Sequence, residues 1–207
     1  MSERLVDTPE GRSRTTTTTP DGGSRGTLVL GHGAGGLRWT QDVLHVRDAA
    51  VDGGWSVVLV DQPWRVASRR IGPAPASLDR AWTAVVEDLA TGPGVGRLVL
   101  GGRSAGARVA CRTASALGAD AVLALSFPLH PPSRPERSRA DELALPAASG
   151  IPVHVVQGRT DPFGGPAEVR AVLPPGASLD EVPGPHSLGR AAVAVAEHVG
   201  AWLDRLP

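Results

Sequence analysis

Ser104 lies in a pattern that can make a serine hydroxyl nucleophilic. The run Gly102-Arg103-Ser104-Ala105-Gly106 spells G-x-S-x-G, and it stands between an apolar run at 98–100 and an alanine-rich amphipathic stretch. A strand, a sharp turn and a helix in this order hold a serine on a strained elbow, with its hydroxyl exposed above a sheet. Glycine fits both shoulders of so tight a turn, because a Cβ there would press on neighbouring backbone. The pattern therefore indicates a nucleophilic serine.

A nucleophilic serine needs a base that removes its proton and a third group that orients the base. On a parallel sheet with such an elbow, the partners follow in the order serine, acid, histidine, each in a loop at the carboxyl end of a later strand. Asp161 follows a strand-like run at 153–156, and His186 follows a weaker run at 178–182 and precedes the final helical stretch. We therefore expect Ser104 to be the nucleophile, Asp161 the orienting acid and His186 the base.

An acyl-transfer transition state also needs donors for its oxyanion, usually two backbone N–H groups. Ala105 supplies the first by its position directly after the nucleophile. The second is expected from the glycine-rich loop at 31–36, which follows an apolar run at 27–30. Ala34 is the preferred donor and Gly33 the alternative, while His32 is expected to hold the loop by side-chain hydrogen bonds.

The same loop supports a rival function. Gly31, Gly33 and Gly36 spell G-x-G-x-x-G between a strand and a helix, and Asp61 ends the next strand, where a dinucleotide-binding fold has its ribose-binding acid. The Ser-Asp-His set argues against this reading, because a dehydrogenase would not need it. The hydrolase interpretation is therefore favoured over the dinucleotide-binding one.

Three further side chains are candidates for substrate binding. Arg103 could recognise a substrate carboxylate or phosphate, or it could brace the elbow by pairing with a buried acid such as Asp61, which is the favoured alternative. Arg65 follows the strand that ends at Asp61. Like Arg103, it could bind a substrate anion or have a structural role, and the structural role is favoured. His130 lies in a proline-rich interval at 127–150 and could contact substrate.

Strand-like and helical patterns alternate from residue 27 onward, which is typical of a parallel sheet covered by helices. We expect an α/β-hydrolase fold with a mostly parallel sheet of about six to seven strands, helices on both faces and no separate lid domain. The interval at 127–150 predicts only a rim or small cap beside the ligand crevice. Strands are expected at 27–30, 55–60, 97–100, 121–125, 153–156 and 178–182, and helices at 39–51, 77–89, 104–117, 166–172 and 188–203.

The length of 207 residues suits a single domain at 26–207. It is preceded by a flexible segment at 1–25, in which five consecutive threonines could form an edge strand. Acidic and basic residues balance at 21 each, so neither nucleic acid nor a membrane is an expected partner. The single Cys111 fits a reducing compartment, and without a recognisable secretory signal we expect a cytoplasmic protein. No metal or organic cofactor is expected, and the oligomeric state stays open.

With these residues in place, the chain resembles a small, lidless α/β-hydrolase family. That family includes bacterial hydrolases and related animal proteins, namely testis-expressed proteins and subunits of the NSL histone-acetyltransferase complex. The resemblance implies Ser104, Asp161 and His186 as nucleophile, acid and base. The chain departs from the family at Pro185, often Asp, and at Ala107, often Gly. The matching segments are 31–36 (GHGAGG), 61–67 (DQPWRVA), 101–110 (GGRSAGARVA), 127–132 (FPLHPP), 156–164 (VQGRTDPFG) and 186–188 (HSL).

The sequence thus predicts a serine hydrolase that cleaves a small ester or related acyl substrate through an acyl-serine intermediate. Because some animal relatives act as complex subunits, a non-catalytic scaffold or interaction protein is the first alternative. A dinucleotide-binding protein is the second.

Overall fold

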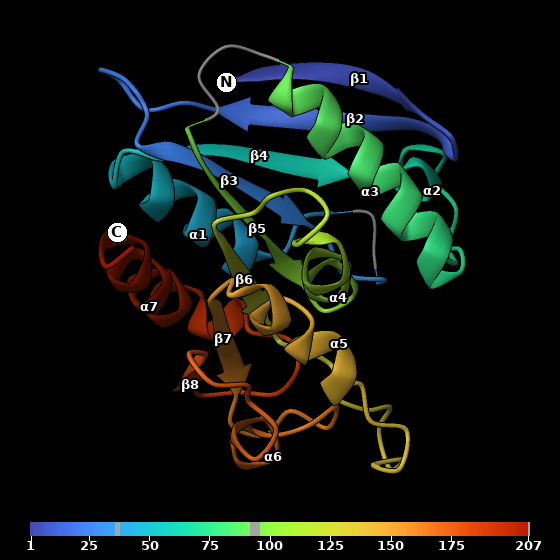
Figure 1. Cartoon of the computed structure of the whole chain (residues 1–207), viewed down its shortest axis with the longest axis vertical. Helices are drawn as coiled ribbons and strands as arrows, with labels where there is room; N and C mark the ends of the chain where they lie inside the picture. Colours follow the sequence, from blue (N-terminus) through green and yellow to red (C-terminus); the bar gives the residue numbers. More distant parts are fainter. Residues whose placement is uncertain (36–37, 92–95, 207) are drawn as a thin grey trace.

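A single eight-stranded sheet runs through the molecule (Figure 1). The computed structural model describes residues 1–35, 38–91 and 96–206. The spatial order of the strands is β1-β2-β4-β3-β5-β6-β7-β8, and neighbours from β4 to β8 run parallel. The strands are β1 (Ser2–Thr8), β2 (Gly11–Thr18), β3 (Gly26–Gly31), β4 (Ser56–Asp61), β5 (Arg97–Arg103), β6 (Ala121–Leu125), β7 (Val153–Gly158) and β8 (Ser178–Val182).

The six parallel strands are the six that the apolar runs predict. Central strands such as β6 are buried along their whole length, because helices cover both faces of the sheet. Alternate side chains of one strand therefore enter different cores: Val29 packs on one side of β3, and Leu28 and Leu30 pack on the other. This arrangement confirms the predicted α/β-hydrolase fold.

Residues 2–8 and 11–18 of the N-terminal segment form strands, and residues 15–18 of the threonine run lie in β2, as the strand alternative predicted. The segment forms a hairpin of β1 and β2, and β2 pairs antiparallel with β4, with Thr15 opposite Val60. The β-branched threonines suit an extended strand, and Ser13, Thr15 and Val6 are buried once the hairpin packs on the sheet. Two antiparallel strands thereby extend the expected six or seven to eight.

Helices form a layer on each face of the sheet. On one face, α3, α4, α5 and α6 contribute to a core that includes Trp82, Val109 and Leu143. On the other, α1 packs against α7 over a core that includes Val46 and Trp202. The helices are α1 (Gln41–Asp52), α2 (Pro63–Val66), α3 (Pro75–Ala90), α4 (Ala105–Thr113), α5 (Ala140–Ala144), α6 (Pro166–Arg170) and α7 (Ala192–Asp204), with 3-10 turns at Ala147–Ser149 and Gly189–Ala191.

The proline-rich interval between β6 and β7, here called the rim, holds only the five-residue helix α5 and one 3-10 turn, and none of its residues lines either of the two cavities described below. Glu142 of α5 binds Arg108 of α4 through two hydrogen bonds of 2.6 and 2.8 Å. Arg139 donates a hydrogen bond of 2.6 Å to the carbonyl of Pro128. The rim is therefore fastened to the helix that follows the elbow.

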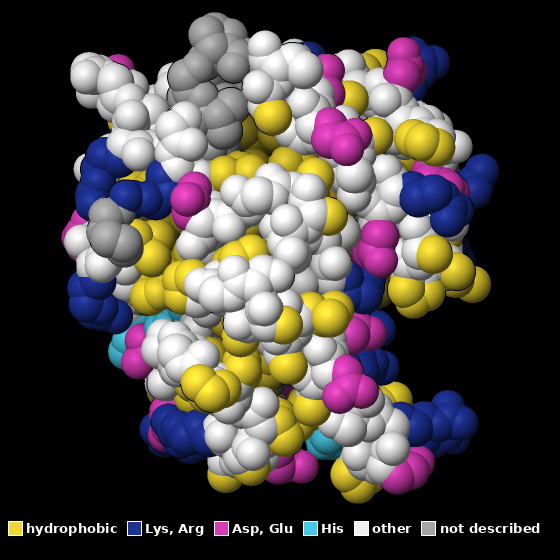
Figure 2. All heavy atoms as spheres, viewed as in Figure 1, with side chains coloured by type: hydrophobic (Ala, Val, Ile, Leu, Met, Phe, Trp, Pro, Cys, Tyr) yellow, Lys and Arg dark blue, Asp and Glu magenta, His cyan; other side chains and the backbone are white. Residues whose placement is uncertain are grey.

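On the face seen in Figure 2, acidic and basic side chains are interspersed around the edge of the molecule. This distribution fits the balanced charge of the sequence. Across the described residues, no helix has the length and apolar character needed to cross a membrane.

Candidate active site

Ser104 occupies a strained turn between β5 and α4, with φ 53° and ψ −107°. The glycines beside it are required by close backbone packing. A Cβ on Gly102 would lie 2.5 Å from the carbonyl oxygen of Gly31, and a Cβ on Gly106 would lie 2.3 Å from the same oxygen. The end of β3 therefore packs directly against the elbow, and this contact needs glycine on both sides of the serine.

Ser104 and His186 lie within hydrogen-bond distance, and His186 in turn contacts Asp161. The Nε2 atom of His186 is 2.9 Å from Ser104 Oγ, and its Nδ1 atom is 2.8 Å from Asp161 Oδ2. A carboxylate can only accept, so the Nδ1–H of His186 donates to Asp161 and leaves Nε2 to accept the serine proton. We call this the Ser104–His186–Asp161 chain. It has the protonation pattern that a general base needs.

Asp161 is fixed by two neighbours that the sequence did not single out. The side-chain amide of Gln157 donates to Asp161 Oδ2 at 3.0 Å, and the backbone N–H of Phe163 donates to Oδ1 at 2.8 Å. The ring of Phe163 also lies 4.3 Å from that of His186, centroid to centroid. Both residues lie in the segment 156–164 that carries the family resemblance, and Gln157 is also the one amide in β7.

A cavity of about 430 Å³ lies beside the serine and is lined by both Ala34 and Ala105. Gly33, the alternative oxyanion donor, does not line it. Arg70 and Arg108 also face the cavity, and Arg108 is bound to Glu142. The apolar walls come from Trp64, Ile71, Pro73, Leu78, Trp82 and Val109.

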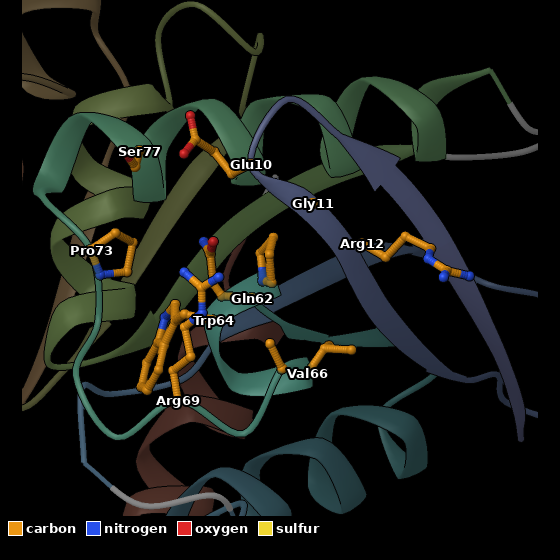
Figure 3. Close-up of a pocket in the computed structure, with 11 residues that line it drawn as sticks. Glu10, Gly11, Arg12, Gln62, Trp64, Val66, Arg69, Pro73 and Ser77 are labelled. Carbon is orange, nitrogen blue, oxygen red and sulfur yellow. The ribbon is translucent and has the colours of Figure 1, made fainter.

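A second cavity, of about 300 Å³, lies at the turn of the β1–β2 hairpin (Figure 3). It shares Gln62, Trp64 and Pro73 with the first cavity, so these residues separate the two. Ser104 is among the lining residues of neither cavity. The first cavity is lined by Ala105 and Gly106, which directly follow Ser104, and the second is not, so the first cavity is the one next to the elbow.

His32 holds the loop after β3, as expected. Its Nδ1–H donates to the carbonyl of Gly33 at 2.8 Å, and its Nε2 accepts from the backbone N–H of Gln62 at 3.1 Å. The ring packs edge-on against Trp39 and Trp64. Burial lowers the pKa of His32 to about 4, so the ring is neutral at pH 7 and keeps both hydrogen bonds.

The three side chains predicted as substrate contacts are engaged elsewhere, and none lines the 430 Å³ cavity. Arg103 pairs with Asp42 rather than with the expected Asp61. Asp61 instead forms an ion pair with Arg65, four residues later, at 3.2 Å. The guanidinium of Arg65 also lies over the ring of Trp39. His130 contacts the carbonyl of Pro131 at 2.9 Å and Glu168 at 3.1 Å. The arginines that do face the cavity are Arg70 and Arg108.

The loop after β3 has a role in packing that the dinucleotide-binding interpretation does not explain. Gly31 lies against Gly106 of the elbow, and Ala34 lines the same cavity as Ala105. Gly36, the last glycine of the rival motif, lies outside the described residues. In the described part of the chain, no group of three or more His, Cys, Asp or Glu side chains is placed to hold a metal ion.

A mostly parallel sheet with a serine at its strand-to-helix elbow defines the α/β-hydrolase class. Residues 24–194 match Abhydrolase_11, the family described as an alpha/beta hydrolase domain, and the chain belongs to this family. No curated protein is significantly similar to it in sequence.

Several solved structures share the fold. A lidless α/β serine hydrolase, XC6422 from Xanthomonas campestris, is 19% identical with a TM-score of 0.78, covering 100% of this chain and 95% of that one. An α/β serine hydrolase homologue from Coxiella burnetii is 17% identical with a TM-score of 0.82, covering 98% and 97%. Est1E from Butyrivibrio proteoclasticus is 16% identical with a TM-score of 0.82, covering 100% and 99%. At these identities the similarity concerns the fold.

Proposed function

We propose that this α/β hydrolase is a serine hydrolase that cleaves a small ester or related acyl compound. The observation that carries the proposal is the Ser104–His186–Asp161 chain, with contacts of 2.9 and 2.8 Å. Its members come from loops far apart in the sequence, and each performs a distinct step of acyl transfer.

In the proposed mechanism, Ser104 Oγ attacks the acyl carbon while His186 Nε2 takes the serine proton. The backbone N–H groups of Ala34 and Ala105 stabilise the oxyanion. His186 then gives the proton to the departing alcohol, which leaves an acyl-serine. A water molecule, deprotonated by His186, releases the acid and restores Ser104. Asp161 orients the imidazole throughout and stabilises its protonated form.

The cavity supports a substrate with an apolar acyl group. Its volume of about 430 Å³ suits a small ligand, and its walls include two indole rings and several aliphatic side chains. The rim is held against α4 by the Arg108–Glu142 pair, so we expect the cavity to stay open to solvent without the movement of a lid. We further propose that residues 26–207, together with the β1–β2 hairpin that extends the same sheet, act as one catalytic domain and that the protein works in the cytoplasm.

Labelling with a fluorophosphonate probe tests the proposal. Wild-type protein is expected to be modified at Ser104, and the variants Ser104→Ala and His186→Ala are expected to lose labelling. Ser115→Ala is the control, because Ser115 is an exposed serine whose hydroxyl contacts Ser149. Folded wild-type protein that is not labelled would contradict the proposal. That result would instead favour the non-catalytic scaffold suggested by the resemblance to animal complex subunits.

A further inference from the structure

Arg103, the residue before the nucleophile, contacts three separate parts of the site. Its side chain is 12% exposed, and its Nε lies 3.2 Å from Asp42 Oδ2 of helix α1. Its Nη2 donates a hydrogen bond of 2.7 Å to the backbone carbonyl of His186. Its Nη1 would lie 3.1 Å from a Cβ placed on Gly33, so the guanidinium also packs on the loop after β3.

Asp42 holds the guanidinium in this orientation. The Asp42 side chain is completely buried, and among the described residues neither of its oxygens has a hydrogen-bond partner. A buried carboxylate is costly unless an opposite charge lies beside it, and Arg103 supplies that charge. Nε of Arg103 likewise forms no hydrogen bond to the described residues, so the ion pair places the guanidinium beside Asp42 by charge, and the hydrogen bond that Arg103 donates runs from Nη2 to the His186 carbonyl.

The carbonyl of His186 is a point at which the whole histidine loop is fixed. Ser126, at the end of β6, donates a second hydrogen bond of 3.0 Å to the same oxygen. The residues from 183 to 188 form no helix or strand, so these two donors hold the backbone from which the imidazole extends. A displacement of about 1 Å at a catalytic group can cost on the order of 100-fold in rate.

We propose that Arg103, anchored by Asp42, is a positioning residue that holds the His186 backbone and the loop at Gly33 in register with Ser104. The proposal rests on the serine-hydrolase function proposed above. It assigns Arg103 no contact with substrate, in agreement with its absence from the lining of the 430 Å³ cavity. One guanidinium thereby couples the base, the nucleophile and the oxyanion loop.

Steady-state hydrolysis of p-nitrophenyl butyrate by Arg103 and Asp42 variants tests this role. Arg103→Met is expected to lower kcat on the order of 100-fold while KM stays within about twofold, because the substrate pocket is untouched. Arg103→Lys restores part of kcat, since an ammonium keeps the charge but cannot hold both partners in the fixed geometry of the guanidinium. Asp42→Asn is expected to give an intermediate loss of kcat.

The double variant Arg103→Met/Asp42→Asn separates positioning from folding, because it leaves no unpaired buried charge. Its kcat is expected to equal that of Arg103→Met, since both changes remove the same contact. Arg112→Met is the matched control: Arg112 lies on α4, the helix after the elbow, and the change removes its two hydrogen bonds to Asp79 of α3, at 2.6 and 2.8 Å, and one to Glu142 of α5, at 2.8 Å. This control should lower the unfolding temperature and leave kcat unchanged.

A folded Arg103→Met or double variant with kcat within about threefold of wild type would overturn the proposal. An increase in KM with unchanged kcat would overturn the proposal, because it would indicate that Arg103 binds substrate. An equal fall of kcat in Arg112→Met would also overturn it, because the loss would then reflect lower stability and not positioning. Fluorophosphonate labelling of the wild type keeps the two proposals apart. An unlabelled, inactive wild type overturns both, whereas an active wild type with unaffected variants overturns only the role of Arg103.

Discussion

Replacing Gly106 by alanine is expected to lower both the stability of the protein and its ester hydrolysis. A Cβ at this position would lie 2.3 Å from the carbonyl oxygen of Gly31 and 2.5 Å from its carbonyl carbon. Favourable contacts between carbon atoms lie at roughly 3.5–4.0 Å, so the end of β3 must move by about 1 Å. The colliding atoms are all backbone, which cannot rotate out of the way.

The size of the effect follows from two opposing contributions. Alanine in place of glycine within a helix gains about 1 kcal/mol, whereas overpacking of this kind costs about 1–3 kcal/mol. With backbone against backbone we take the upper end, which gives a net loss of about 2 kcal/mol. For a chain of this length that corresponds to an unfolding temperature lower by roughly 4–8 °C. Because Gly31 leads into the loop that carries Ala34, kcat is expected to fall on the order of 100-fold.

Gly200→Ala provides the control for this substitution. Gly200 lies within α7, and a Cβ there would meet no atom within 4 Å. The same change of residue should therefore raise the free energy of unfolding by about 0.5–1 kcal/mol and leave hydrolysis unchanged. Urea unfolding and p-nitrophenyl butyrate hydrolysis measure both quantities. Gly106→Ala protein that is as stable as Gly200→Ala, or that hydrolyses ester at the wild-type rate, would refute the reasoning.

Three further predictions concern the acid, the rim and the cavity. Asp161→Asn removes the charge that orients His186, so steady-state kinetics should show kcat reduced on the order of 10³–10⁴-fold; retention of a tenth of wild-type kcat would contradict the assigned role. The carbonyl of Pro131, and after it Glu168, raise the pKa of His130. The contribution of His130 to the free energy of unfolding is therefore complete at pH values below its unfolded-state pKa of about 6.5. This contribution is lost as the pH rises through the higher folded-state pKa. In urea unfolding, His130→Gln should therefore lose more stability relative to wild type at pH 5.5 than at pH 8.5, and an equal loss at both would count against it. Leu78→Trp narrows the cavity. The fall in kcat/KM should therefore be at least about tenfold larger for p-nitrophenyl hexanoate than for p-nitrophenyl acetate. An equal fall for both esters would show that Leu78 does not contact the acyl group.

The sequence alone predicted that Ser104, Asp161 and His186 lie at one edge of the sheet. Each follows an apolar run, and the carboxyl ends of parallel strands lie at the same edge, so order along the chain predicts proximity in space. The steric requirement for glycine at 102 and 106 was also predictable, because the elbow is a local turn. Local periodicity and strand order therefore determined the fold class and the candidate site.

Only the tertiary structure decided which groups surround that site. Asp42, 61 residues before its partner Arg103, replaced Asp61 because helix α1 crosses beside the elbow, and no local pattern encodes that crossing. The cavity walls likewise combine side chains of α2, α3 and α4, and the N-terminal threonines became a strand because β4 offered an unpaired edge. Such contacts depend on how helices and strands pack at long range, which the pattern of a single segment does not contain. The residues proposed to perform chemistry therefore followed from order along the chain, whereas those proposed to position them and to bound the substrate followed from packing.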